Sequence, residues 1–491
     1  MTRPAVLIRR HVRGQVRPCR HPGKSRVPPA TVGVMVVAVI EGACVSTPLQ
    51  RNSLAGVSRL DAAGREQPPR RPALSRGLSF WVAATMAFLA FAANAAASPL
   101  YRVYQARFGF SATTLTLLFA VYIVVLLVTL LFLGPLSDYV GRRPVILTGL
   151  AVGALSCGLF LLAHGEEMLF AARAVQGVAV GLISGAASAA LLDLRPISHA
   201  TPLVSSLAPS GGQALGALGA SALAQYALAP TRFVWWVFLA AFIVGSLAVA
   251  TMPEPGRRHP VVASALRAHV SVPRGVRGSF GVAVPCLVAV WALAGFFLSL
   301  GPSLAALLLH SDNLVWGGVV ILLFTGLGAA GSATLAMGEP SRVMLTGCLV
   351  LVAGALVTFV AVETASPVIL LSGTAIAGFG FGPAFTGAYR AVTTQGPPAD
   401  RAGLITAIYI VSYLATGVPA VVGGIATSHY GLDGTAQVYS LVVAALTAAA
   451  VIVLISRIRV AGRSVRYTST LDPPPGPGTV PPCPPATNQY R

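Results

Sequence analysis

The sequence contains a series of continuous apolar runs, each about 20 residues long. A helix needs this length to cross about 30 Å of hydrocarbon at 1.5 Å per residue. Barrel strands would be half as long and would alternate in polarity. The sequence therefore predicts an all-α membrane protein with twelve spans, at 79–98, 113–134, 145–163, 168–191, 202–227, 232–252, 281–301, 314–337, 342–362, 367–390, 403–428 and 435–456.

Composition excludes several other classes of protein. Of the 491 residues, 55% are apolar and 10% are charged, whereas soluble domains are about 25% charged. More than half of the basic residues fall in the two ends of the chain rather than in a stripe on a folded domain, which argues against nucleic-acid binding. The six cysteines stand singly, so neither a disulfide framework nor a metal site is indicated. No cofactor is expected.

The basic residues between the spans predict the orientation, because Lys and Arg near span ends stay in the cytoplasm. With both termini inside, the outer loops hold three basic residues, Arg102, Arg107 and Arg232. The inner loops then hold eleven. These are Arg142, Arg143, Arg195, Arg257, Arg258, Arg267, Arg274, Arg277, Arg342, Arg390 and Arg401.

The longest internal loop, which is rich in Pro and Arg, divides the spans six and six. The sequence therefore predicts two six-helix bundles, at 79–252 and 281–456, joined by a cytoplasmic linker at 253–280. The basic N-terminal tail (1–78) and the Pro-rich C-terminal tail (457–491) are expected to be disordered. Whether residues 1–78 belong to the native protein stays open.

The loop after the second span reads Gly-Pro-Leu-Ser-Asp-Tyr-Val-Gly-Arg-Arg-Pro. Gly134 and Gly141 allow a tight turn, and Asp138, Arg142 and Arg143 can pair within it or reach helix ends. Judged by charge alone, the loop could be a simple positive-inside anchor. Its order of glycine, acid, glycine and paired basic residues closely resembles the loop signature of the major facilitator superfamily. That resemblance covers about residues 79–456 and implies two bundles that rock around a central site.

Further positions resemble the family, and two depart from it. Arg173, Gln176 and Gly177 look like its second motif. The resemblance implies that Asp138 contacts the start of the eleventh helix, near Gly403, and controls conformational exchange. The second-half loop lacks the acid-glycine-arginine core, and the fifth span lacks the glycine–proline pattern of drug and proton antiporters.

Arg173 is the one basic residue well inside a span, where insertion of Arg costs about 2.5–3.5 kcal/mol. It is expected to face the bundle or a water-filled cavity together with Gln176 and Gly177. The alternative is that Arg173 snorkels to the headgroups and that the nearby small residues only let helices pack closely.

In the family, the first, fourth, seventh and tenth spans line the central cavity, so the resemblance adds Asn94, Trp291 and Phe297 as candidates. None of the 14 acids lies in mid-membrane, which weakens a carboxylate proton relay. Asp138 and Asp193, at helix ends, are the remaining candidates. Few charges and several aromatic residues favour a neutral or cationic apolar substrate.

The sequence favours a secondary active transporter, not an enzyme, which exports a drug-like or metabolite solute by proton-linked antiport across the bacterial inner (plasma) membrane. The alternative is uptake of a sugar or metabolite by symport or uniport; a non-transporting sensor and a polytopic membrane enzyme are remote possibilities. The expected partners are a small-molecule substrate and the lipid bilayer, with neither nucleic acid nor ATP, and the chain is expected to be a monomer.

Overall fold

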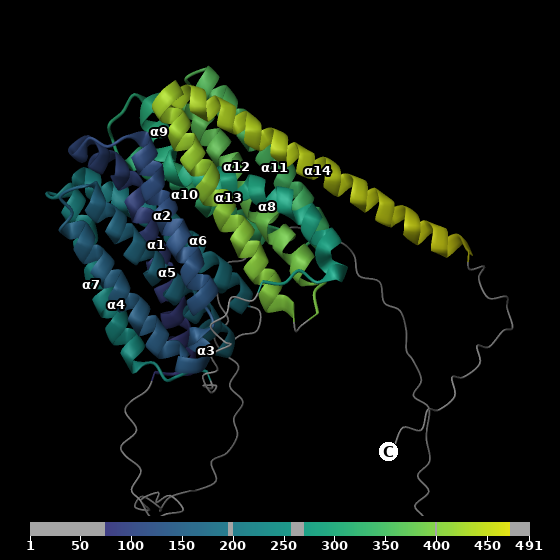
Figure 1. Cartoon of the computed structure of the whole chain (residues 1–491), viewed down its shortest axis with the longest axis horizontal. Helices are drawn as coiled ribbons and strands as arrows, with labels where there is room; N and C mark the ends of the chain where they lie inside the picture. The colour runs from purple at the N-terminus through teal and green to yellow at the C-terminus, as the bar shows by residue number, and fades with distance from the viewer. Residues whose placement is uncertain (1–73, 195–199, 257–269, 398–399, 472–491) are drawn as a thin grey trace, which may run out of the picture. The chain divides into compact units, whose positions relative to one another are not determined.

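The computed structural model describes residues 74–194, 200–256, 270–397 and 400–471. The described residues all belong to one compact unit that begins at Arg70. Most of the expected N-terminal tail, the middle of the linker and residues 472–491 lie outside the described residues. Figure 1 shows that the described segments are helices joined by short connections.

Each predicted span corresponds to one long helix, as the sequence indicated. The first half holds α1 (Arg76–Phe108), α2 (Ala112–Leu133), α4 (Arg142–Leu161), α5 (Glu166–Leu194), α6 (Ala200–Tyr226) and α7 (Pro230–Thr251). The second half holds α8 (Arg277–Ser299), α10 (Val315–Thr334), α11 (Pro340–Glu363), α12 (Pro367–Thr393), α13 (Arg401–Tyr430) and α14 (Leu432–Leu471). The prediction of an all-α membrane fold is confirmed.

In the part of the chain that the structure describes, 11 helices are long and apolar enough to cross a membrane. The long helix outside that set is α6. Its serines and Gln213 lower its mean hydropathy, and four of these residues, Ser205, Ser206, Ser210 and Gln213, line the central cavity described below.

The structure corrects the expected boundaries in four places. Helix α14 continues to Leu471, past the end of the predicted span at 456 and into the predicted disordered tail (Figure 1). A short helix, α3 (Leu136–Val140), occupies the loop after α2. A second short helix, α9 (Gly301–Leu309), follows α8. A 3-10 turn, η2 (Arg274–Val276), directly precedes α8. Hydrophobic length identifies spans but not these short interfacial pieces.

Glycine faces bring helices within the second half close together. Gly347 and Gly354 lie seven residues apart on α11, so they share one face. A Cβ added at Gly347 would lie 2.2 Å from the Ala384 backbone N, and one at Gly354 would lie 2.3 Å from the Ala377 backbone N. Small residues permit such backbone approach where no hydrophobic force drives helices together in lipid.

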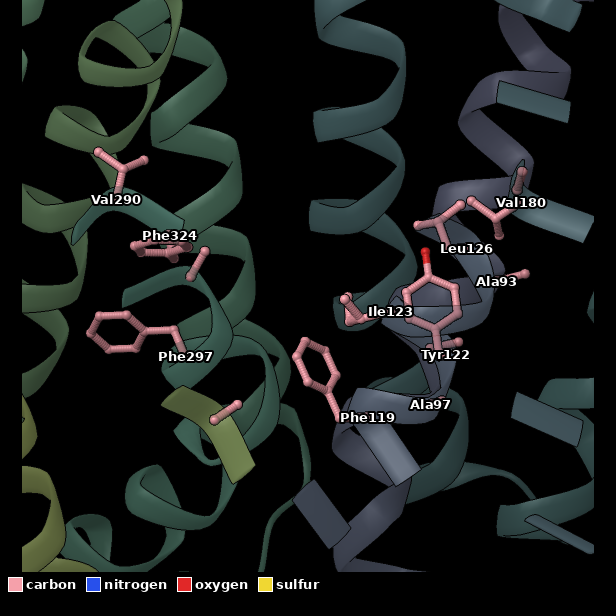
Figure 2. Packing of buried hydrophobic residues seen from close by; sticks show 14 of the residues in the cluster. Ala93, Ala97, Phe119, Tyr122, Ile123, Leu126, Val180, Val290, Phe297 and Phe324 are labelled. Carbon is pink, nitrogen blue, oxygen red and sulfur yellow. The ribbon is translucent and has the colours of Figure 1, made fainter. Parts of the chain in front are cut away.

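Each half has its own buried apolar side chains. Tyr122, Leu126 and Val180 pack in the first half, and Phe297 and Phe324 pack in the second (Figure 2). The halves meet mainly where α2 packs on α13 and where α6 packs on α10.

Hydrogen bonds between the halves gather at one end of the helices, which we call the outer end because it lies opposite the α2–α4 loop. Thr113 Oγ1 lies 3.0 Å from Ser428 Oγ, and the Leu314 backbone N donates to Gln225 Oε1 over 2.9 Å. The opposite end of the helices, where α3 lies, is called the loop end. The hydrogen bonds between the halves therefore join them at the outer end.

Candidate functional site

A cavity of about 340 Å³ lies between the two halves, within the loop-end part of the spans. Helices α1, α2, α5 and α6 line it from the first half, and α8, α10, α12 and α13 line it from the second. We call this the central cavity. Its volume is at the lower end of the range for small-molecule sites.

The first half provides a hydroxyl-rich wall. Ser184 and Ser188 lie four residues apart on α5 and so share a face. Ser205, Ser210 and Gln213 of α6 lie opposite them. These α6 residues were not among the predicted site residues, although their polarity within an otherwise apolar span is a signal in the sequence.

The second half provides an aromatic wall centred on Trp291 of α8. The ring centroid of Trp291 lies 5.4 Å from that of Phe381 and 5.2 Å from that of Phe385, both nearly perpendicular to it. Tyr413 of α13 is tilted against the same indole, with centroids 6.3 Å apart. Edge-to-face pairs of this kind stabilise a rigid surface beyond the area that they bury.

Two polar groups of this wall are buried without a hydrogen-bond partner among the described residues: Trp291 Nε1 and Ser412 Oγ. A buried indole N–H usually has an acceptor. Both residues line the central cavity, so a rotation of either side chain would bring its polar atom to the surface of the cavity, where a bound solute could provide the missing partner.

The described lining of the central cavity carries no formal charge. No Asp, Glu, Lys, Arg or His is found among its described lining residues. A fixed ion in the solute would find no counterion there, whereas hydroxyl and amide groups can satisfy neutral polar groups.

Arg173 lies outside the central cavity, in a separate buried cluster of the first half. Its side chain is 0% exposed, which rules out snorkelling. Nη1 donates to Asn94 Oδ1 over 3.2 Å and to Gln176 Oε1 over 2.5 Å. The guanidinium also lies over the Tyr122 ring, 4.6 Å from its centroid, and over Tyr101 at 5.4 Å. It thereby joins α1, α2 and α5.

Five of the six candidate cavity residues lie outside the lining of the central cavity. Trp291 lines the central cavity, but Arg173, Gln176 and Asn94 form the buried cluster instead. Gly177 packs on α2, where an added Cβ would lie 2.8 Å from the Tyr122 carbonyl oxygen. Phe297 is buried behind Phe324, with ring centroids 4.9 Å apart. Family position identifies the helix that lines a cavity but not which of its faces does so.

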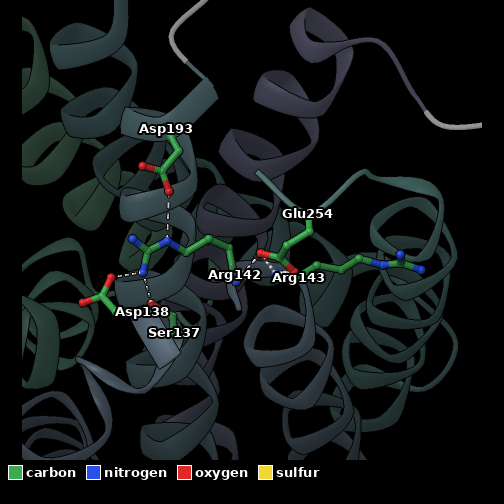
Figure 3. Close-up of polar contacts among 6 residues, drawn as sticks. All are labelled: Ser137, Asp138, Arg142, Arg143, Asp193 and Glu254. Carbon is green, nitrogen blue, oxygen red and sulfur yellow. Dashed lines mark hydrogen bonds and ion pairs between the residues drawn. The ribbon is translucent and has the colours of Figure 1, made fainter. Parts of the chain in front are cut away.

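The α2–α4 loop forms a network around Arg142 (Figure 3). Arg142 Nη1 donates to Asp138 and, over 2.8 Å, to Ser137 Oγ, while Nε donates to Asp193 Oδ2 over 3.0 Å. Gly141 has a φ of +112°, which glycine adopts readily and other residues rarely do. Within the described residues Asp138 makes its hydrogen bond to Arg142 and none to α13, so the expected contact near Gly403 is not formed in this state.

Glu254, at the end of α7, holds the start of α4. Its Oε1 accepts from the Arg142 backbone N over 2.6 Å, and its Oε2 accepts from the Arg143 backbone N over 3.3 Å (Figure 3). A carboxylate at a helix N-terminus satisfies free N–H groups and complements the helix dipole. The sequence showed Glu254 at a span end but did not predict this cap.

In the second half, the corresponding helix start is capped by an acidic residue from its own loop. Glu339 precedes α11 and accepts from the backbone N of Ser341 and Arg342, over 3.0 and 2.9 Å. Partial burial raises the pKa of Glu339, but these backbone hydrogen bonds outweigh it and hold that pKa below its usual value. The second-half loop thus keeps a capped helix without the acid-glycine-arginine core.

Comparisons with known proteins agree with this architecture. The model of the Major Facilitator Superfamily matches residues 83–339, which is more than half of the chain. Among solved structures, a mutant of the nucleoside transporter NupG superposes with a TM-score of 0.59, covering 77% of this chain and 99% of that one. At 13% identity, this likeness concerns the fold alone.

Two relatives are similar over short segments. The chloramphenicol resistance protein CraA of Acinetobacter baumannii is 37% identical over 91 residues, which cover 17% of this chain and 22% of CraA. The multidrug transporter MdfA of Yersinia pestis is 34% identical over 128 residues, which cover 25% of this chain and 30% of MdfA. The matched segments thus span less than a third of either relative.

Proposed function

The chain belongs to the major facilitator superfamily, and from this premise we propose that it is a secondary active transporter that exports drug-like solutes. It is a multi-pass membrane protein of a transporter family. The partial similarity to proteins named for drug transport and chloramphenicol resistance supports export as the direction and drugs as the substrate class.

The proposed substrate class rests on the central cavity. Its described lining is uncharged and has one hydroxyl-rich wall and one aromatic wall. Rings of a solute can pack on Trp291, Phe381 and Phe385, while its polar groups meet the serines of α5 and α6. The free N–H of Trp291 favours a solute with a hydrogen-bond acceptor beside the ring. We therefore propose neutral, amphipathic aromatic solutes.

The positions of the cavity and the interhalf hydrogen bonds support alternating access. The cavity occupies the loop-end part of the spans, and the hydrogen bonds that join the halves lie at the outer end. Rocking of the halves would break the outer contacts and open the cavity to the other side. Loop charge supports a cytoplasmic loop end, with both termini cytoplasmic and the protein in the plasma membrane.

The proposed export is coupled to proton movement through a carboxylate at the loop end. The acids best placed for it are Asp138 and Asp193, because both bind Arg142 at the loop end, where rocking would rearrange the helices. Loss of either carboxylate charge would weaken the hold on Arg142. This mechanism uses no ATP and no cofactor, and a single chain contains the whole cavity.

Substitution of Trp291 tests the proposed substrate class. Trp291→Phe keeps an aromatic ring and removes the unpaired N–H, while Trp316→Phe changes a half-exposed tryptophan outside the cavity. In cells that express matched amounts of protein, chloramphenicol accumulation should rise with Trp291→Phe and stay at the wild-type level with Trp316→Phe. Loss of one neutral hydrogen bond, worth about 0.5–1.5 kcal/mol, predicts an affinity decrease of about two- to tenfold. Equal behaviour of the two variants would remove Trp291 from the site.

A further inference from the structure

A second hollow, of about 290 Å³, lies along the seam between α2 and α13. We call it the seam groove. Its lining is apolar except for one phenol. The lining residues are Ala120, Ile123, Val124 and Leu127 of α2, and Tyr413, Leu414, Gly417, Val418, Val421 and Val422 of α13.

The seam groove lies midway along both helices and on the outside of the protein. Val418 is 59% exposed and Val422 is 60% exposed, whereas Ile123 and Leu127 are buried and form the floor. A surface at this depth of a membrane-spanning helix contacts lipid tails rather than water. Only an apolar or aromatic group can fill the seam groove without losing hydrogen bonds.

The hollow is a local feature of the seam rather than loose packing throughout. Toward the outer end, a Cβ added at Gly424 would lie 1.9 Å from Thr116 Oγ1, so the two helices touch there. Two turns away, a Cβ added at Gly417 would meet Ile123 at an ordinary 3.5 Å. The two helices are therefore closer together at Gly424 than at Gly417, where there is room for a side-chain atom.

Tyr413 belongs to the lining of both the seam groove and the central cavity. Leu130, three residues after Leu127 and on the same face of α2, also lines the central cavity. The Tyr413 phenol has no hydrogen-bond partner among the described residues, and its ring is held by tilted contacts with Trp291 and Tyr409. One side chain thus stands between the two spaces.

We propose that the seam groove is a lateral portal, through which apolar aromatic solutes dissolved in the bilayer reach the central cavity past Tyr413. The proposal rests on the proposed function, because it supplies the same cavity from the membrane. Its occupant is the ring system of the solute, for which Tyr413 offers an aromatic contact at the inner end of the groove. A change in the rotamer of Tyr413 joins the two spaces without a movement of helices.

Filling the seam groove without touching the central cavity tests the portal. Gly417→Leu places an apolar side chain in the groove, and Gly417 does not line the central cavity. Gly158→Leu is the control, since a Cβ at Gly158 meets no atom within 4 Å and the residue lies on α4. The full-length chain is purified into liposomes with a pH gradient, and two uncharged probes are followed: Nile red, which dissolves in the bilayer, and chloramphenicol, which is far more soluble in water.

Gly417→Leu should lower the initial rate for Nile red by about tenfold, which corresponds to about 1.4 kcal/mol, and change the chloramphenicol rate by less than about twofold. Retained chloramphenicol transport also shows that the variant folds. If it does not reach the membrane, Val418→Trp fills the seam groove from its exposed side. Equal effects on both probes, or none, would overturn the portal and leave the proposed function intact. Transport of neither probe by the wild type would overturn the proposed function and the portal with it.

Discussion

Replacing Arg173 with glutamine separates two roles for a buried cation: a structural anchor and a part of the transport cycle. In the structure its guanidinium joins Asn94 of α1, Gln176 of α5 and the Tyr122 ring of α2. We expect Arg173→Gln to fold and reach the membrane, but to transport poorly, because those three helices line the central cavity.

The expected stability follows from opposing contributions. Removing the charge relieves about 2.5–3.5 kcal/mol of unfavourable insertion. It also removes two hydrogen bonds from a charged donor, about 1.5–3 kcal/mol each, and a cation–π contact of about 1–2 kcal/mol. A glutamine amide can restore one neutral bond to Asn94, worth about 1 kcal/mol. The free energy of unfolding should therefore change by between a gain of about 0.5 kcal/mol and a loss of about 4.5 kcal/mol.

The assay compares Arg173→Gln and Arg173→Lys with Arg232→Gln, which removes an exposed arginine at the start of α7. Thermal unfolding of the purified proteins measures stability, and export at matched membrane abundance measures function. Arg173→Lys keeps the charge but loses the planar fork, so it should also be impaired. Full export by both Arg173 variants would refute the reasoning and leave Arg173 without a part in the mechanism.

Four further outcomes are expected. Glu254→Gln should reduce the free energy of unfolding by about 0.3–2 kcal/mol in thermal melts, because a carboxylate leaves the α4 N-terminus. The lowered pKa of Glu339 means that its stabilisation is complete above its ordinary value of 4.5 and lost as pH falls through the lowered pKa, so Glu339→Gln should flatten the acid side of the stability profile. Asp138→Asn should slow transport while equilibrium substrate binding stays within a few-fold. In a background without native cysteines, Leu228→Cys should react with an impermeant thiol reagent added outside intact cells and Val270→Cys should not; the reverse would overturn the topology.

The fold was largely predictable because membrane insertion depends on local hydrophobic length. Each apolar run became one helix, even α6, whose polar residues lower its hydropathy. Helix ends were less predictable, since α14 continues beyond the apolar run to Leu471. The network around Arg142 was foreseen as pairing within the loop, but the distant partners Asp193 and Glu254 depend on how α5 and α7 pack.

The central cavity was less accessible to sequence reasoning, because its lining depends on the rotation of each helix about its axis. Trp291, a candidate from family position, lines the central cavity, while Phe297, six residues later, faces the core instead. Arg173 is a disfavoured charge that needs partners. Its Nη1 has them within its own half, whereas its Nε and Nη2 are buried without a hydrogen-bond partner among the described residues. Tyr413 was not predicted to line the cavity, since an aromatic residue in a span is usually core or lipid-facing.

Transport by the purified chain measures the central claim most directly. Liposomes that contain the protein, and no ATP, are given a pH gradient, and the movement of chloramphenicol against its own concentration gradient is followed. The account predicts accumulation that depends on the pH gradient and disappears when a protonophore collapses it, with reduced rates for Trp291→Phe and normal rates for Trp316→Phe. Chloramphenicol that only equilibrates, at the rate of liposomes without protein, would contradict it.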